Sequence, residues 1–218
     1  MWIWYRATQI KKRLTEYVTI DEYFPLMKEL SKDLSVSKYA THLVYMTGSY
    51  SGKLIESKII YSIFQKQPKR ADIYWFIHID VTDSPYTMEY KVDILVPDDV
   101  VRVEFKLGFK IEHRVNLFFR KVVEDMVKNK EIDFTSRYSS LSKRNVIGDF
   151  RFVVLEKHLS NENNLPPIDQ FAMNGYFAFK NVSLSEQSAF GLDTSAVTIE
   201  KVPLIIAPIE DFQLRRVL

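Results

Sequence analysis

The sequence predicts an α/β fold: a mixed β-sheet with one β-α-β crossover, an added antiparallel hairpin and flanking helices, plus a β-rich C-terminal extension. Three observations lead to this prediction. Segments with apolar residues at spacings of three and four, as in helices, alternate with short apolar runs through the first 130 residues. The run 72–81 is apolar at nearly every position, as in a strand covered on both faces. Residues 100–107 alternate between apolar and charged side chains, as in one strand of a half-buried hairpin.

The first part of the chain is predicted to contain a helix over 20–35, a strand over 39–47, a helix over 53–67 and a strand over 72–81. Both helices carry apolar side chains at spacings of three and four, and Pro68 ends the second one. The polar loop TGSYSG separates the first strand from the second helix. A strand, a helix and a strand in this order imply a parallel pair joined by a right-handed crossover.

The remaining elements extend this sheet. Strands 88–96 and 100–107 flank Pro97-Asp98-Asp99, with Arg102, Glu104 and Lys106 on the face opposite the apolar side chains. Residues 114–130 form the clearest helical stripe. Segment 135–149, rich in Ser and basic residues, is expected to be a mobile loop. Further strands are predicted at 150–156, 174–180 and 196–206, in a second small sheet or an extension of the first.

The composition of the chain excludes several classes of protein. The chain has 218 residues, a formal net charge of +2 and no Cys, which excludes disulfide scaffolds, thiolate nucleophiles and Cys-ligated zinc. The small net charge gives no reason to expect nucleic acid as a partner. No apolar run approaches the roughly 20 residues of a membrane span, and no secretory signal is present. We therefore expect a water-soluble, intracellular domain cut from a larger protein.

No catalytic signature stands out. The four histidines never occur at metal-ligand spacings, and His42 and His78, in predicted strands, are expected to be packed or hydrogen-bonded structural residues. The segment from Gly48 to Gly52 has Tyr50 at its centre, where a nucleophile elbow needs Ser. Acids near the strand ends are expected to be solvated. The sequence thus predicts no catalytic residue, no metal site, no cofactor and no enzymatic activity.

The loop between the first strand and the second helix has the composition of an anion site. Free N–H groups at a helix start bind anions, and a cation and hydroxyls beside them would add to this. The candidate ligand-binding residues, for an anion or a nucleotide, are Thr47, Ser49, Tyr50, Ser51 and Lys53. The glycine spacing does not fit a P-loop, and a plain flexible β-α turn is the alternative interpretation.

The N-terminus admits two interpretations. Trp2, Trp4 and Tyr5 precede four basic residues without any acid between them. Interfacial aromatic rings followed by cationic side chains are typical of the point where a chain leaves a membrane. An amphipathic extension or an interface arm would have the same composition.

The stretch from Tyr39 to Phe109 resembles a known family. The segments KYATHLVYMTGS, HIDVTDSPY and RVEFKLGF follow one another as in the C-terminal cytoplasmic portion of Kup-type (Kup/HAK/KT) potassium uptake transporters. The similarity extends over about residues 14–130. One departure is Ala40-Thr41-His42, which stands where Pro-Gly-Thr is common in the family. The resemblance favours the membrane-exit interpretation of the N-terminus.

This resemblance implies a division of the chain. Residues 1–13 would end the last membrane helix and form a basic juxtamembrane segment, and 14–38 would form a linker helix. A mixed α/β core over 39–134, the mobile loop 135–149 and a β-rich part of the same domain over 150–218 would follow. The domain would lie at the cytoplasmic face of the cell membrane, as the soluble part of a membrane protein, and would contain no potassium ligand.

The implied function is regulation and dimerisation of a proton-coupled potassium uptake transporter. The implied partners are a second copy of the chain, in a homodimer, and the membrane portion of the same transporter. Relatives from Gram-positive bacteria suggest cyclic di-AMP as a ligand. The alternative is a free-standing intracellular nucleotide-sensing protein with an amphipathic N-terminal arm.

Overall fold

The computed structural model describes residues 2–48, 53–138, 140–144, 146–159, 165–182, 192 and 197–204. The chain divides into two compact units. One contains Met1–Thr15, Glu156–Ser185 and Lys201–Leu218, and the other contains Glu16–Leu155 and Glu186–Glu200. Most of the regular structure lies in the larger unit.

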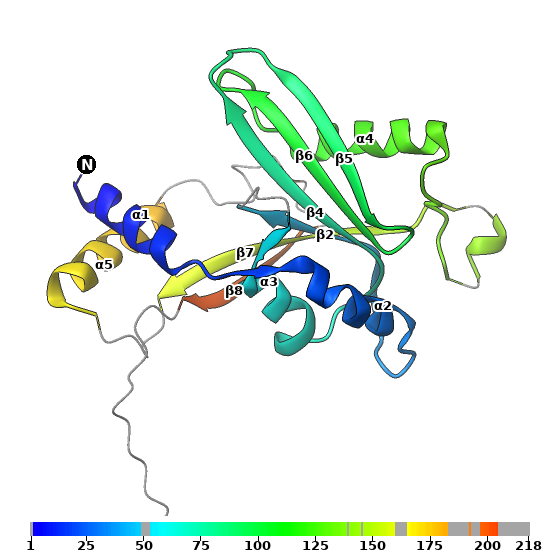
Figure 1. Cartoon of the computed structure of the whole chain (residues 1–218), viewed down its shortest axis with the longest axis horizontal. Helices are drawn as coiled ribbons and strands as arrows, with labels where there is room; N and C mark the ends of the chain where they lie inside the picture. The colour runs from blue at the N-terminus through cyan, green and yellow to red at the C-terminus, as the bar shows by residue number, and fades with distance from the viewer. Residues whose placement is uncertain are drawn as a thin grey trace, which may run out of the picture. The chain divides into compact units, whose positions relative to one another are not determined.

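A six-stranded mixed sheet organises the chain, as the sequence predicts (Figure 1). Its strand order is β5-β6-β4-β2-β7-β8. Strands β2, β4, β6 and β7 run parallel, and β5 pairs antiparallel with β6. The bounds are Lys38–Thr47 for β2, Arg70–Thr82 for β4, Met88–Val96 for β5, Val100–Gly108 for β6, Phe150–Leu159 for β7 and Val197–Leu204 for β8.

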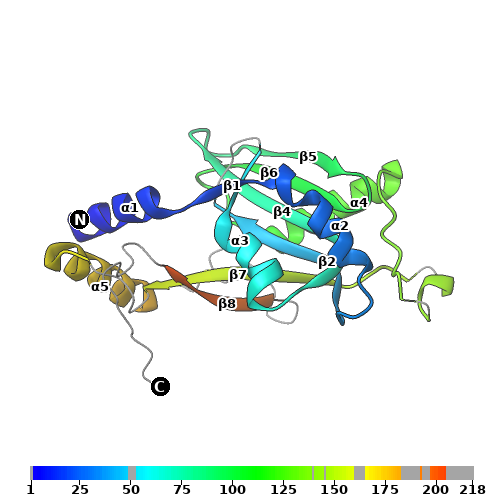
Figure 2. The same ribbon diagram turned by 60° about the horizontal axis from the view of Figure 1, so that its bottom comes forward.

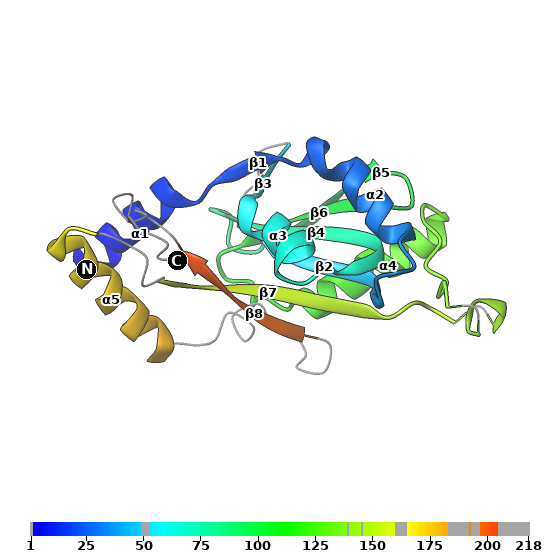
Figure 3. The same ribbon diagram turned by 90° about the horizontal axis from the view of Figure 1, so that it is seen from below.

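Helices cover both faces of this sheet (Figures 2 and 3). The 3-10 turn Ile20–Tyr23, α2 (Phe24–Lys32), α3 (Ser57–Tyr61) and the π-helical turn Ser62–Lys66 lie on one side, and α4 (Val115–Asn129) lies on the other. A two-stranded antiparallel sheet joins β1 (Tyr17–Thr19) to β3 (Leu54–Glu56). The β2–α3–β4 step is the predicted β-α-β crossover.

Trp75 is the centre of the core beneath α4. Its side chain is fully buried, and its ring meets Phe119 of α4 edge-on at 5.3 Å between centroids. Phe134 stacks on the same indole at 5.8 Å. Aromatic pairs of this geometry add about 0.5–1.5 kcal/mol to the free energy gained from burial. The apolar stripe predicted for 114–130 therefore packs against the strand predicted to be covered on both faces.

Three local predictions are corrected by the structure. The helix predicted over 53–67 begins at Ser57, because residues 54–56 are extended and pair with β1. The strand predicted over 174–180 is wrong, because α5 (Pro167–Val182) occupies this stretch. Buried Ala172, Met173 and Tyr176 follow a helical period that the shorter window 174–180 hides.

The third correction concerns the hairpin, which is more deeply buried than predicted. Strand β6 lies between β5 and β4, and two of the three charged side chains on its polar face are buried, whereas Lys106 is exposed. Arg102 and Glu104 are 7% and 3% exposed. The register places Asp93 opposite Arg102 and Lys91 opposite Glu104, so that opposite charges face each other across the two strands.

Segment 135–149 contains local order. Thr135 forms an isolated antiparallel bridge with Ile147, and the Ser136 amide donates to the Val146 carbonyl at 2.7 Å. A 3-10 turn covers Ser142–Arg144. Of the predicted C-terminal strands, 150–156 and 196–206 correspond to β7 and β8, which extend the main sheet.

The smaller unit pairs α1 (Trp2–Leu14) with α5. Its apolar contact is made by Ala7, Ile10, Met173 and Tyr176. Arg6 Nε lies 2.6 Å from Asp169 Oδ1 and adds an ion pair between the two helices. Within the described residues, none of the helices has both the length and the hydropathy of a membrane span.

Candidate ligand-binding edge of the sheet

The predicted anion loop begins where β2 ends. Thr47 is the last residue of β2, and Lys53 directly precedes β3. Ser49, Tyr50 and Ser51 lie outside the described residues. The helix start that was expected to supply free N–H groups is displaced to Ser57, so Lys53 stands four residues before it. The predicted anion site therefore keeps its cation and its strand end, and it loses the adjoining helix terminus.

The described residues around this loop hold its two ends in place. The Gly48 amide donates to Glu56 Oε1 at 3.0 Å, and His78 Nδ1 donates to the Thr47 carbonyl oxygen at 3.0 Å. A Cβ at Gly48 would come 2.8 Å from Glu56 Oε1, which is too close for any larger residue without movement of Glu56. The backbone at the end of β2 is thus fixed by side chains from β3 and β4.

Lys53 is already paired with an acid. Its Nζ lies 2.7 Å from Asp21 Oδ2, and its carbonyl oxygen accepts from the Ile20 amide at 2.8 Å. The hydrogen bond to Asp21, followed by the Coulomb attraction of the same carboxylate, raises the pKa of Lys53. The ammonium is therefore charged at neutral pH, and a bound anion would compete with Asp21 for it.

The topology places the end of β2 at a change in the direction of the strand order. The chain leaves β2 towards β4 on one side, whereas β7 flanks β2 on the other side. In open α/β sheets, ligands bind outside the carboxyl ends of the parallel strands, where the strand order reverses. Thr47 and Gly48 lie at such an end of β2.

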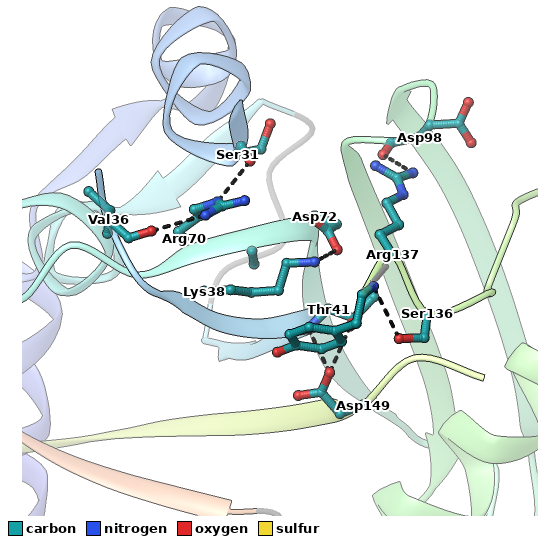
Figure 4. A network of polar contacts seen from close by, with 12 residues as sticks. Ser31, Val36, Lys38, Thr41, Arg70, Asp72, Asp98, Ser136, Arg137 and Asp149 are labelled. Carbon is teal, nitrogen blue, oxygen red and sulfur yellow. Dashed lines mark hydrogen bonds and ion pairs between the residues drawn. The ribbon is translucent and has the colours of Figure 1, made fainter. Parts of the chain in front are cut away.

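A polar network that the sequence did not predict lies at the amino ends of β2 and β4 (Figure 4). Lys38 Nζ lies 2.6 Å from Asp72 Oδ2, and the Thr41 amide and hydroxyl donate to Asp149 Oδ1 at 3.0 and 2.7 Å. Arg70 donates to the carbonyl oxygens of Ser31 and Val36 at 3.2 and 3.1 Å. These contacts join α2, the strand starts and segment 135–149, which indicates a structural role.

A second unpredicted network is buried. Lys69 is 0% exposed, and its Nζ lies 3.0 Å from Glu200 Oε1 and donates to the Ser62 carbonyl oxygen at 2.6 Å. The Ser62 hydroxyl donates to Glu200 Oε2 at 2.6 Å, and the Tyr45 hydroxyl lies 2.8 Å from Ser62 Oγ. Burial raises the pKa of Tyr45, so its hydroxyl stays neutral.

His42 is packed in the core, as predicted for a strand histidine. Its ring stacks on Phe150 with centroids 4.3 Å apart, and Nδ1 accepts from Trp75 Nε1 at 3.4 Å. Burial lowers the pKa of His42 to about 4. Among the described residues, no group of three or more His, Asp or Glu side chains is placed to hold a metal ion.

These features define a class: an α/β domain with a covered mixed sheet and a polar loop at the carboxyl end of its central strand. Residues 40–206 match the family model described as "K+ potassium transporter C-terminal domain". The chain belongs to this family.

Curated relatives support the same assignment. A "Probable potassium transport system protein Kup" from Cytophaga hutchinsonii is 71% identical over 217 residues, which is 100% of this chain and 33% of the relative. Proteins with the same description from Flavobacterium johnsoniae and Enterococcus faecalis are 52% and 42% identical and match 100% and 95% of the chain. The chain spans about a third of the length of these relatives. No solved structure matches.

Proposed function

We propose that the chain is the cytosolic regulatory and dimerisation domain of a proton-coupled potassium uptake transporter. The observation that carries this proposal is the family match over residues 40–206, together with relatives described as potassium transport proteins and about three times as long. The ion pathway would then lie in the membrane portion of the transporter. The domain would act on transport without any chemical reaction of its own.

The N-terminal helix fits the proposed position at the cytosolic face of the cell membrane. Trp2, Trp4 and Tyr5 are all exposed on α1 and line a hollow of about 540 Å³ with Thr8. Exposed Trp and Tyr side chains favour the interface between a bilayer and water. In this proposal residues 1–13 continue a membrane helix, 14–38 link it to the domain, and 39–134 with 150–218 form the domain.

Regulation requires contacts that differ between the conformations of the transporter. A domain or a ligand shifts a conformational equilibrium only by its difference in affinity for the two states. The loop between β2 and β3 is the proposed ligand site, and cyclic di-AMP is the proposed ligand. Its two phosphates suit a cation at a strand end, and Lys53 supplies that cation.

The coding sequence of the gene tests whether the chain is part of a membrane transporter. An open reading frame that encodes hydrophobic helices upstream of Met1, in frame with it, is the expected result. A coding sequence that starts at Met1 with no such helices would refute the transporter assignment of the chain.

Calorimetric titration of the 218-residue chain with cyclic di-AMP tests the ligand. We expect Lys53→Ala to weaken binding and Asp21→Asn to strengthen it, because the second change frees the ammonium from its partner at 2.7 Å. Lys128→Ala, which removes an exposed cation from α4, is the matched control and should bind like the unchanged chain. No heat at high micromolar ligand rejects cyclic di-AMP. Binding that is unaffected by both Lys53→Ala and Asp21→Asn places the site elsewhere.

A further inference from the structure

Strand β5 forms an open edge of the sheet. It pairs with β6 on one side, and no other strand among the described residues pairs with its outer side. Figures 1 and 2 show it as the last strand beyond β6. Because β5 is nine residues long, it presents a row of backbone donors and acceptors to a further strand.

The edge is apolar on one face. Met88, Tyr90 and Ile94 point to the same face of β5 and are 59%, 44% and 41% exposed. The residues opposite them on β6 are buried. Tyr90 reaches α4, where its hydroxyl donates to Asp125 Oδ2 at 2.9 Å. An exposed, apolar edge of this length is unfavourable for an isolated domain unless another strand covers it.

The charged side chains of β5 determine which strand can pair with its outer side. Lys91 and Asp93 lie on the other face of β5, with Lys91 Nζ 2.9 Å from Asp93 Oδ1. In an antiparallel pair, residues directly opposite each other point to the same face of the sheet. When the two strands are copies of β5 related by a two-fold axis, this requires one central residue to lie opposite its own copy. The register is therefore defined by that central residue. Centring on Lys91 or Asp93 would oppose like charges, which is destabilising.

Centring on Val92 overlaps all nine residues of the two strands and opposes no like charges, with Glu89 opposite Leu95. Lys91 of one copy then faces Asp93 of the other, and Asp93 faces Lys91. Tyr90 faces Ile94 on the apolar face, and Val92 faces Val92. Centring on Tyr90 also avoids like-charge pairs and places Glu89 opposite Lys91, but it overlaps only residues 88–92 of the strand and leaves Asp93 opposite Thr87. Within the strand, centring on Met88 or Ile94 avoids like charges as well but opposes no charges of opposite sign.

We propose that two copies of this chain associate through β5, antiparallel and centred on Val92, so that their sheets become continuous. This inference rests on the proposed dimerisation and identifies its surface. Lys91 and Asp93 then have a double role. They disfavour pairing with an unrelated apolar strand, which would bury charged side chains against apolar ones, and they favour a second β5 in the Val92 register.

The absence of Cys from the chain provides a direct test. Val92→Cys would place two thiols opposite each other, with Cα atoms about 4.5–5.5 Å apart, within the range of a disulfide. Met88→Cys is the matched control on the same strand face, because its two copies would be about 27 Å apart along the antiparallel strands. Tyr90→Cys reports on the alternative register.

The measurement is non-reducing electrophoresis after mild oxidation, together with the mass of the unmodified chain in solution by analytical ultracentrifugation. We expect a dimer in solution and a crosslinked species of twice the chain mass for Val92→Cys, lost on reduction and absent for Met88→Cys. A crosslink at Tyr90→Cys alone refutes the register. A dimer in solution without a crosslink at either position refutes the β5 surface but leaves the proposed dimerisation intact. A monomer at all concentrations refutes both, and the transporter assignment is then judged separately by the gene.

Discussion

Acidification from pH 7 to pH 4 is expected to lower the free energy of unfolding through His42. This imidazole is fully buried against Phe150, and burial lowers its pKa from 6.5 to about 4. Asp149 and Asp133 oppose this shift by Coulomb attraction, and Arg137 adds to it. Trp75 Nε1 donates to Nδ1, so a proton on Nδ1 would also replace this hydrogen bond by a contact between two donors.

The sign and the size follow from the two pKa values. The folded chain binds the proton less tightly than the unfolded chain, so the stabilisation is complete above pH 6.5 and is lost as the pH falls towards 4. A difference of 2.5 between 6.5 and about 4 corresponds to about 3 kcal/mol, since each pKa unit is worth about 1.4 kcal/mol. That is a large part of the stability of an ordinary domain.

Urea unfolding followed by circular dichroism, at closely spaced pH values from 7 to 4, measures this loss. His42→Phe is the comparison variant, because it keeps an aromatic ring against Phe150 and cannot be protonated. The lowered pKa values of Asp33 and Asp125 act below about pH 4 in both proteins, so they cancel in the difference. The charge of His42 contributes to the lowered pKa of Asp133, so the two proteins are compared above pH 4. Identical pH profiles for the two proteins between pH 6.5 and pH 4 would show that His42 does not carry the effect.

Two further predictions concern other parts of the fold. Lys69→Met should destabilise the chain by about 3–5 kcal/mol, because it leaves the Glu200 carboxylate without its ammonium, and Lys69→Met with Glu200→Gln should recover part of this loss in urea unfolding. If the double variant recovers none of the lost free energy of unfolding, the loss comes from packing and not from the unpaired carboxylate. Gly108→Ala should cost at least about 1–3 kcal/mol, because a Cβ there would overlap the backbone of Pro85, whereas Gly175→Ala, with Ile3 Cγ2 at 3.3 Å, should change the thermal midpoint little. Equal midpoints for the two alanine variants would contradict the expected overlap at Gly108.

Periodicity predicted much of the sheet and its main helix. Residues 72–81 are apolar because β4 is covered on both faces, and the stripe over 114–130 is regular because α4 packs along β4 and β6. These signals are local: each strand or helix shows its own burial in its own sequence. The same reasoning missed α5, where apolar side chains fall on more than one face of the helix and imitate a strand in a short window.

The contacts that were missed join distant segments. The partner of Lys69 lies on β8, and the partner of Lys38 lies on β4, so neither pair has a signature at fixed spacing. Asp21, which holds Lys53, precedes it by an entire helix and strand. The composition of the loop after β2 could be recognised from the sequence, whereas the carboxylate that competes for its cation required the fold.

The salt bridge to Glu200 also has a consequence for synthesis on the ribosome. Lys69 is enclosed by the sheet and the π-helical turn, but the carboxylate that neutralises it emerges more than a hundred residues later. Until β8 has left the exit tunnel, closing this part of the core would trap a lone ammonium. Folding of this part of the core therefore waits until Glu200 has left the tunnel, and a nascent chain cut before residue 200 should stay open around Lys69.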